Sequence, residues 1–363
     1  MTTIFNSALS ILEFVLVFGV LVFLHEFGHF IVARLSGIEV EEFGFGYPPK
    51  MVRLFRWRNT DFTLNWIPFG GFCRMKGESG DDTEPGSFAA ARPIKRFFTL
   101  LGGPLMNLLL GMILITYIIM RVGAADTSKV LVAGVAQNSP AAVAGLQVND
   151  IIETVNNTPI TSMDTLTLMI SQNLGKETTL TVLRQDQELK IELTPRENPP
   201  QGEGAMGVEI SNPTKPVTLL QAVPAAFLTT MDQGYQLIML PVKLIRGQIE
   251  PSNARMVSVV GLYSIYNQVQ TTDQQEAAVH PEYAGLNIIN LIAILSIALG
   301  FTNLLPIPAL DGGRILFVLP ELLFRKKVRP EFENRVHMIG FSILMILMVV
   351  LIINDLINPI KLP

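Results

Sequence analysis

Residues 21–33 read LVFLHEFGHFIVA, an H-E-x-x-H pattern inside a stretch that is otherwise apolar. This stretch is predicted to be helical, and residues four apart lie on one face of a helix. His25 and His29 can therefore hold one metal ion while Glu26 points at the open position of that ion, as in zinc hydrolases. The apolar run before the motif contains a single charged residue, Glu13. The pattern thus indicates zinc chemistry inside a lipid bilayer.

The composition indicates a membrane protein. Of the 363 residues, 49% are hydrophobic and 16% are charged, and the mean hydropathy is +0.40. These values do not suit a soluble enzyme of this length. The net charge is −4 and there is no basic stripe with interleaved aromatic residues, so nucleic acid is excluded as a partner. The single cysteine, Cys73, excludes intrachain disulfides and a structural zinc site with cysteine ligands.

Four segments are long and apolar enough to cross the hydrocarbon core of a bilayer, which takes about 20 helical residues. Basic residues crowd the first and third connections between these segments, whereas the N-terminal tail has none. By the positive-inside tendency both connections are cytoplasmic, and the termini and residues 121–285 lie outside. The N-terminus lacks the basic region of a cleavable signal peptide, so we expect it to be retained. The predicted spans are Ala8–Arg34, Phe97–Met120, Leu286–Leu305 and Val336–Leu356.

Residues 40–75, in the first connection, do not have the composition of a plain loop. Apolar and aromatic residues alternate irregularly with polar ones, and glycines and prolines interrupt them. A break at residues 58–61 separates two such runs, which predicts short strands in a hairpin or small sheet at the membrane interface. The backbone edge of such a sheet could pair with an extended peptide. The alternative is an amphipathic loop that only anchors the protein to lipid.

A small soluble α+β domain is predicted after the second span. The string SPAAVAGLQVNDII, residues 139–152, resembles the PDZ signature S-P-A…A-G-L…G-D-x-I of bacterial membrane and periplasmic proteases, with Asn149 where glycine is usual. PDZ domains bind extended peptides or carboxyl termini by strand addition, so a peptide is a candidate ligand. The alternative is a spacer that limits access by its bulk. The predicted strands are Val130–Val135, Asp150–Val155, Thr178–Arg184 and Leu189–Leu193, with helices near Ala141–Ala144 and Ser162–Asn173.

Two segments follow before the third span. Residues 195–207 are rich in Pro, Gly and Glu and are predicted to be a linker. Residues 219–249 carry apolar residues at helical spacing, interrupted by Pro224 and Pro241, which predicts an interfacial helix outside the membrane. The predicted organisation is a first transmembrane helix (1–38), a cytoplasmic-side, membrane-associated β segment (39–96), a second transmembrane helix (97–121), a PDZ domain (126–211), a linker with an interfacial amphipathic helix (212–285), and the third and fourth transmembrane helices (286–363).

A catalytic zinc site uses three protein ligands and keeps a fourth position for water, so one more ligand is needed. We favour Asp311, because a carboxylate near the end of an apolar span is costly unless it is paired or bound to a metal. Pro306 and Pro308 would break the helix before it. Gly312 and Gly313 would permit a tight turn that aims the side chain back at the first span. The alternative for Asp311 is a helix cap. The other candidates for the third ligand are Glu39, Glu41, Glu42, His280 and His337.

Several other polar residues are given structural roles. His280 is interpreted as a surface histidine and His337 as an interfacial one. Asn107, in the second span, is expected to bond across helices rather than to touch substrate, and the glycines at 102 and 103 would let this span approach the first closely. Glu26 is interpreted as a general base rather than a buried ion-pair partner, because the two histidines flank it.

In combination these motifs resemble the site-2 protease family, and within it the bacterial regulator of sigma-E protease type. That type carries two tandem PDZ domains, whereas the residues here suffice for one. The resemblance implies that His25, His29 and Asp311 hold one catalytic Zn²⁺, that Glu26 is the catalytic base and that Asn303 positions substrate near the metal. It also implies that the first-loop strands receive the unwound substrate helix. The motifs are the H-E-x-x-H, Phe43-Gly44-Phe45-Gly46, the Gly-Pro-x-x-Asn of residues 103–107, the PDZ-like insertion and Asn303…Pro306…Asp311-Gly312.

The fold implied is a multi-pass α-helical membrane protein of about four transmembrane helices, with a membrane-interface β-hairpin or sheet and an inserted PDZ domain. The function implied is hydrolysis of peptide bonds within or beside the bilayer. Expected substrates are single-span membrane proteins, such as clipped anti-sigma factors, and signal-peptide remnants. The expected location is the bacterial inner membrane, with the PDZ domain outside and the active site toward the cytoplasm.

Two other functions compete with this one. A non-proteolytic PDZ scaffold or metal-binding membrane protein is disfavoured by the presence of Glu26, which such a protein would not need. A soluble zinc protease with a membrane anchor would require the histidines to lie outside the bilayer.

Overall fold

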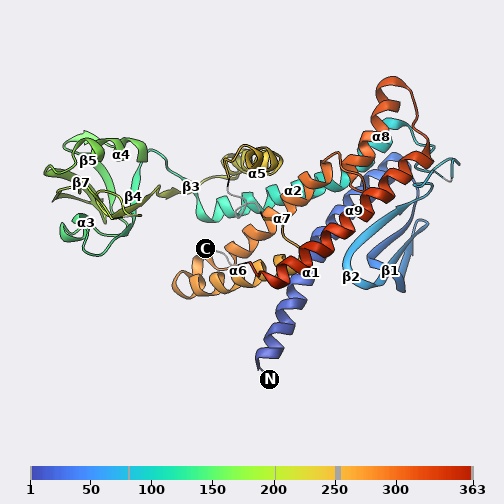
Figure 1. The fold of residues 1–363 in the computed structure, drawn as a ribbon, viewed down its shortest axis with the longest axis horizontal. Coiled ribbons are helices and arrows are strands. Elements are labelled where there is room, and N and C mark those ends of the chain that lie inside the picture. Colours follow the sequence, from blue (N-terminus) through green and yellow to red (C-terminus); the bar gives the residue numbers. More distant parts are fainter. Residues whose placement is uncertain (1, 81, 201, 250–254, 361–363) are drawn as a thin grey trace. The chain divides into compact units, whose positions relative to one another are not determined.

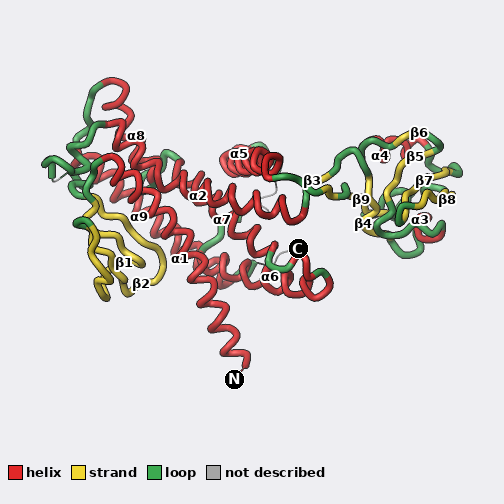
Figure 2. The backbone as a smooth tube through the Cα atoms, turned by 180° about the vertical axis from the view of Figure 1, so that it is seen from behind, coloured by secondary structure: helices red, strands yellow, loops and turns green. Residues whose placement is uncertain are grey.

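The chain forms two compact units, which the computed structural model describes over residues 2–80, 82–200, 202–249 and 255–360 (Figure 1). Residues 250–254 of the predicted 212–285 segment therefore lie outside the described residues. The first unit combines Met1–Ile118 with Val223–Pro363, and the second is Ile119–Ala222. The first is mainly helical with one β-hairpin, and the second is a small α+β unit (Figure 2).

Four described helices of the first unit are long and apolar enough to cross a membrane, as predicted. Few of their apolar side chains are fully buried, which suits helices whose outer faces contact lipid. Between the third and fourth of these helices lies a shorter one, α8 (Asp311–Phe324). The four helices are α1 (Thr2–Ser36), α2 (Pro93–Val122), α7 (Leu286–Leu304) and α9 (Pro330–Ile357), with the short 3₁₀ helix η2 (Pro281–Tyr283) just before α7.

The first connection is a β-hairpin of β1 (Val40–Trp57) and β2 (Thr60–Met75). Its turn falls at Arg58 and Asn59, both with positive φ, as two-residue hairpin turns require. The predicted break is confirmed, but the strands are long rather than short. Bulges shift the register of the two strands. As a result, residues 42–45 of β1 pair with residues 61–64 of β2 on one side and with residues 71–74 of β2 on the other. Among described residues, 71–75 pair on one side only and form an edge.

Aromatic packing fixes the hairpin against α1. Phe43 is 1% exposed, and its ring centroid lies 5.6, 6.5 and 5.5 Å from those of Phe23, Phe27 and Phe30. These three residues recur at the spacing of one helix face. The phenylalanines and the two histidines occupy the same turns of α1 on different faces, so the hairpin is fixed at the level of the predicted metal ligands.

The second unit is built on a sheet of order β8-β7-β5-β4-β9. Its strands β4, β5 and β7 and both helices lie within one residue of their predicted bounds, and β8 begins two residues earlier. Residues 195–207 are not a linker. Met206 is buried in the core, its carbonyl accepts the Ala141 N–H, and the segment leads directly into β9. The elements are β3 (Ala124–Ala125), β4 (Val130–Val135), α3 (Pro140–Val143), β5 (Ile151–Val155), β6 (Thr158–Pro159), α4 (Met163–Gln172), β7 (Thr178–Arg184), β8 (Gln187–Leu193), β9 (Val208–Ser211) and β10 (Thr214–Lys215).

The departure from the PDZ signature at Asn149 has a local explanation. Asn149 has φ of +73°, a left-handed conformation that asparagine tolerates better than most residues other than glycine. The next residue, Asp150, is fully buried and accepts hydrogen bonds from Arg184 Nε and Nη2, both at 2.6 Å, and from the Gln147 N–H. The Asn-Asp pair therefore supplies the same turn and buried carboxylate as Gly-Asp.

This carboxylate makes the stability of the second unit depend on pH. Burial by itself would raise the pKa of Asp150, but the Arg184 and Gln147 hydrogen bonds outweigh it and the pKa lies below its ordinary value. The ionised form then stabilises the fold above the unfolded pKa of about 3.9, and this contribution is lost as pH falls through the folded pKa. We expect Asp150→Asn to cost about 2 kcal/mol at pH 7, less than for a fully buried pair because Arg184 is partly exposed.

Hydrogen exchange of residues 178–193 in the full chain, corrected for intrinsic rates, checks this expectation. The wild type should be better protected than Asp150→Asn at pH 7, and the difference should shrink toward pH 3. A difference that grows on acidification would contradict the assigned sign.

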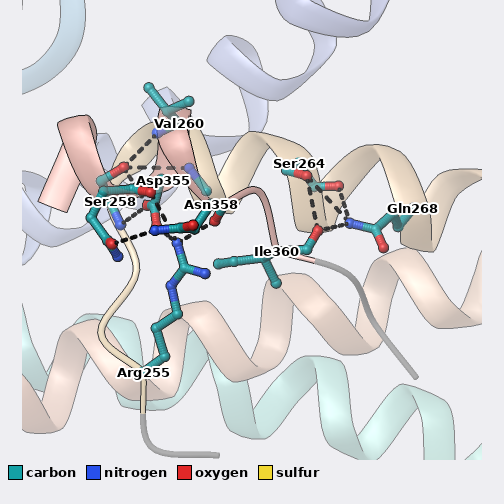
Figure 3. Close-up of polar contacts among 10 residues, drawn as sticks. Arg255, Ser258, Val260, Ser264, Gln268, Asp355, Asn358 and Ile360 are labelled. Carbon is teal, nitrogen blue, oxygen red and sulfur yellow. Dashed lines mark hydrogen bonds and ion pairs between the residues drawn. The ribbon is translucent and has the colours of Figure 1, made fainter. Parts of the chain in front are cut away.

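The region before the third span contains two helices rather than one. Helix α5 (Leu219–Ile245) continues through both of its prolines. Helix α6 (Val259–Val279) corrects the linker prediction for that segment. Ser258 caps α6, and the buried Asp355 of α9 accepts bonds from the Ser258 N–H (2.7 Å) and from Arg255 Nη2 (2.6 Å) (Figure 3). The polar sequence of α6 has little helical amphipathicity, which is why the pattern alone missed it.

Candidate metal centre

Three candidate ligand atoms converge in the first unit. Nε2 of His25 and Nε2 of His29 lie 3.2 Å apart, and Asp311 Oδ2 lies 3.0 Å from the first and 3.3 Å from the second. Both histidines are buried, at 8% and 5% exposure. All three atoms lie within 4.8 Å of one another. The carboxylate favoured from the sequence thus meets the two imidazoles although it is 286 positions from His25.

This donor set fits a zinc ion. Two imidazole nitrogens and a carboxylate oxygen lie within 3.3 Å of one another, and as lone-pair donors they can share a cation as their common partner. Ligands held at the usual distances from Zn²⁺ in a tetrahedron are about 3.3 Å apart, close to the observed 3.0 to 3.3 Å. Three protein ligands of this kind leave the fourth position for water or substrate.

Close contact between α1 and α2 makes room for the two histidines. A Cβ added at Gly28 would lie 2.2 Å from the Gly102 carbonyl oxygen, so the two backbones touch there. A Cβ at Gly103 would lie 2.3 Å from His29 Nε2 and 2.8 Å from His25 Nε2. The His29 Nδ1–H donates to the Thr99 carbonyl at 2.8 Å, which leaves Nε2 free for a metal.

Asn107 supports the other histidine across the helix interface, as expected. Its side chain is fully buried, and Nδ2 lies 3.3 Å from His25 Nδ1. Asn107 Oδ1 has no partner among the described residues. Rotating the Asn107 side-chain amide by 180° would let Oδ1 accept a hydrogen bond from His25 Nδ1–H. In that tautomer of His25 the other nitrogen, Nε2, is free to bind a metal. The Asn107 carbonyl also accepts a bond from Ser296 Oγ of α7 at 2.8 Å.

A compact turn delivers Asp311. Helix α7 ends at Leu304 and α8 begins at Asp311, with Pro306 and Pro308 between them. A Cβ at Gly312 would lie 2.3 Å from the carbonyl oxygen of Leu304, and one at Gly313 would lie 2.3 Å from a carbonyl of the same turn. Both glycines are therefore needed for this close approach, which places Asp311 on the first turn of α8.

Glu26 lines a pocket of about 600 Å³ together with His29 and Asp311. The edge of β2, residues 71–75, lines the same pocket. A Cβ added at Gly71 would lie 3.6 Å from Glu26 Cγ, so the edge and the carboxylate are neighbours. An ion pair between Glu78 and Arg314 also lines the pocket. The pocket therefore brings the edge of β2, the Glu26 carboxylate and two of the three candidate metal ligands to one cavity.

The residues predicted to contact substrate lie elsewhere. Phe43 is in the core and Phe45 stacks on Phe23, with ring centroids 5.1 Å apart. Asn303 Nδ2 donates to the Leu299 carbonyl within its own helix. In the described part of the chain, neither Asn303 nor residues 43–46 line the pocket. Residues 43–45 instead pair with 71–73, so they support the edge that does line it.

The rival ligands have other partners. Glu42 also lines the pocket but pairs with Arg74 at 2.7 Å, and His280 is exposed beside Glu282. No rival belongs to the cluster found among the described residues, His25, His29 and Asp311. Thr99 acts through its backbone carbonyl, so no sequence signal points to it. Arg314 was not predicted either, although it lies about one helical turn after Asp311 and lines the pocket.

Comparisons with known proteins agree over almost the whole chain. The profile of "Peptidase family M50" matches residues 13–347. A "Putative zinc metalloprotease" of Clostridium acetobutylicum is 30% identical over 98% of this chain and 99% of its own, and a protein of the same description from Clostridium perfringens is 33% identical over 95% and 98%. "Regulator of sigma-W protease RasP" of Bacillus subtilis is 26% identical over 96% and 98%. A solved structure, "HtrA-type protease AlgWS227A with decapeptide", is similar over 22% of this chain and 25% of that one, with 26% identity and a TM-score of 0.19.

Proposed function

Because this chain belongs to peptidase family M50 and is a zinc metalloprotease of the membrane, we propose that it cleaves single-span membrane proteins within or beside their spans. The observation that carries the proposal is the meeting of His25, His29 and Asp311 on helices of an apolar bundle. A soluble enzyme with a membrane anchor would have no need to build its ligands into a span.

In this proposal His25 Nε2, His29 Nε2 and the Asp311 carboxylate hold one zinc ion. Bound zinc would lower the pKa of its water toward about 7 and polarise the scissile carbonyl. Glu26 would accept the proton of the attacking water and return it to the leaving amine. Thr99 and Asn107 would orient the imidazoles of His29 and His25 through hydrogen bonds to their Nδ1 atoms, the nitrogens that do not face the metal.

The edge of β2 would hold the substrate. A transmembrane helix hides its carbonyls in internal hydrogen bonds, so it must unwind before water can attack. Residues 71–75 offer backbone groups to an added strand, and Gly71 leaves the chain space beside Glu26. This assigns substrate pairing to residues 71–75, and residues 43–46 become the support of that edge.

The second unit would act as a PDZ domain. Strand β9 pairs only with β4 among described residues, so its other edge is available. An apolar groove of about 370 Å³ lies between this strand and α4, lined by Leu166, Ile170, Val208 and Ile210. We infer that it accepts an extended peptide, such as the new terminus of a clipped substrate. Binding of a labelled peptide with a free carboxyl terminus, compared with its amide, tests this: equal binding would contradict terminus recognition.

The substrates proposed are clipped anti-sigma factors and signal-peptide remnants in a bacterial inner membrane. The name of the Bacillus subtilis relative, a regulator of a sigma factor, supports that class. The basic residues of the first and third connections support an active site toward the cytoplasm, with the second unit outside.

The direct test is cleavage by the full chain reconstituted in liposomes with a labelled single-span substrate. We expect products whose new termini, mapped by mass spectrometry, fall within the span. A chelator should abolish cleavage and added Zn²⁺ should restore it. Intact substrate under zinc-replete conditions would favour a non-proteolytic scaffold, and cleavage only of the soluble tail would favour an anchored soluble protease.

A further inference from the structure

The turn before Asp311 is held in an unfavourable backbone conformation. Ala309 has φ of +76°, a left-handed value that costs an alanine about 1 kcal/mol. Within the segment the Leu310 N–H donates to the Ile307 carbonyl at 3.2 Å and closes the turn, whereas Pro306 and Pro308 have no N–H to donate. The Ala309 N–H takes no part in this closure, so a contact from outside the segment can fix the left-handed residue itself.

His337 of α9 provides that contact. The Ala309 N–H donates to His337 Nδ1 at 2.9 Å, across 28 positions of sequence. The imidazole also packs edge-to-face against Phe317 of α8, with ring centroids 5.5 Å apart. His337 Nε2 is buried without a partner in the described part of the chain, so the ring makes one hydrogen bond there, and it is to the turn.

The backbone of α9 contacts the same turn one helical turn further on. A Cβ added at Gly340 would lie 2.4 Å from Pro308 Cβ and 2.9 Å from the Pro308 carbonyl oxygen. Residues three apart share a helix face, so His337 and Gly340 form one surface against the turn. The left-handed Ala309 lies two residues before Asp311, and any change in its φ redirects the carboxylate.

We propose that His337 is a positioning residue that holds Ala309 in its left-handed conformation and thereby directs Asp311 at the metal. This inference rests on the proposed zinc site, and it means that α9, the last span, helps to position one of the zinc ligands. His337 touches neither substrate nor metal. It acts through the turn, so its removal should loosen the ligand set before any substrate is bound.

Two variants separate the acceptor from the shape of the ring. His337→Phe keeps a planar ring against Phe317 but has no acceptor for the Ala309 N–H. His337→Asn keeps an acceptor atom close to the Nδ1 position and loses part of the ring. A purely structural role in packing would be hurt more by Asn, whereas the proposed role is hurt more by Phe.

The experiment measures zinc affinity of the full chain in detergent by competition with a chelating indicator. We expect His337→Phe to bind zinc about tenfold more weakly and His337→Asn to stay within about threefold of wild type. In the metal-free protein, the 305–312 amides should exchange faster in His337→Phe, with β1 and β2 unchanged. Equal affinity of wild type and His337→Phe, or faster exchange throughout the unit, would overturn the proposal.

A reference variant separates this inference from the proposed function. His25→Ala should lose high-affinity zinc binding. If it binds as well as the wild type, the metal site itself is wrong and the role of His337 falls with it. If only His337→Phe is indistinguishable from the wild type, the zinc site stands and the positioning role is removed.

Discussion

Glu26→Gln is expected to lower the turnover number of proteolysis by about 10³-fold while zinc affinity stays close to that of the wild type. Glutamine keeps the shape of the side chain and its place in the pocket beside Gly71, but it cannot take a proton from water at neutral pH. Glu26 is not one of the three converging ligands, so its replacement should leave the ligand set intact.

The measurement is the initial rate of cleavage in liposomes at saturating substrate, with zinc content determined on the same preparations. Glu13→Gln is a matched control, because it makes the same change in the same helix. Glu13 accepts a bond from Gln270 at 2.8 Å, and no described part of the pocket includes it. We expect this control to retain wild-type turnover. A Glu26→Gln enzyme as fast as the control would remove Glu26 from the mechanism.

Asp311→Asn is expected to weaken zinc binding by at least about 100-fold and to abolish cleavage at limiting zinc. Removing the charge leaves two neutral imidazoles and an amide, a poor set for a dication. The loss of zinc affinity should be larger than for any variant of a residue that only supports a ligand, such as Asn107 or His337. The reason is that Asp311 Oδ2 itself lies within 3.3 Å of both imidazole nitrogens.

Glu42→Gln is the informative comparison for Asp311→Asn. Glu42 is a rival carboxylate from the sequence and lines the same pocket, but its partners are Arg74 and Thr63. We expect the zinc affinity of the Glu42→Gln variant to stay within a few-fold of that of the wild type. If Glu42→Gln lost zinc and Asp311→Asn did not, the third ligand would have to be reassigned.

Some of this molecule follows from local sequence. A span is specified by the length of its own apolar run, so all four appear where predicted, with no bound more than six residues from the prediction. The i, i+4 geometry that pairs His25 with His29 is internal to one helix. Strands such as Val130–Val135 follow from β-branched runs between turn residues, and the Asn149 turn follows from its own backbone preference.

Other elements depend on partners that are distant in sequence. Helix α6 has too polar a surface to be recognised alone and is stabilised by Tyr266, which is buried against Phe14 of α1, and by the Gln270 to Glu13 hydrogen bond. Residues 195–207 have the composition of a linker, yet Met206 completes a core made of other strands. In both cases the favourable free energy comes from burial against another element, which no window of local sequence contains.

The sequence by itself determined the four spans, the histidine pair, the candidate base and a short list of carboxylates for the third position. Only the tertiary structure decided that Asp311 meets the histidines, that residues 71–75 rather than 43–46 face Glu26, and that α9 holds the turn through His337. The first group depends on the periodicity and hydrophobic length of single segments. The second depends on strand register and on glycine contacts such as Gly28 with Gly102, which exist only when separate segments pack together.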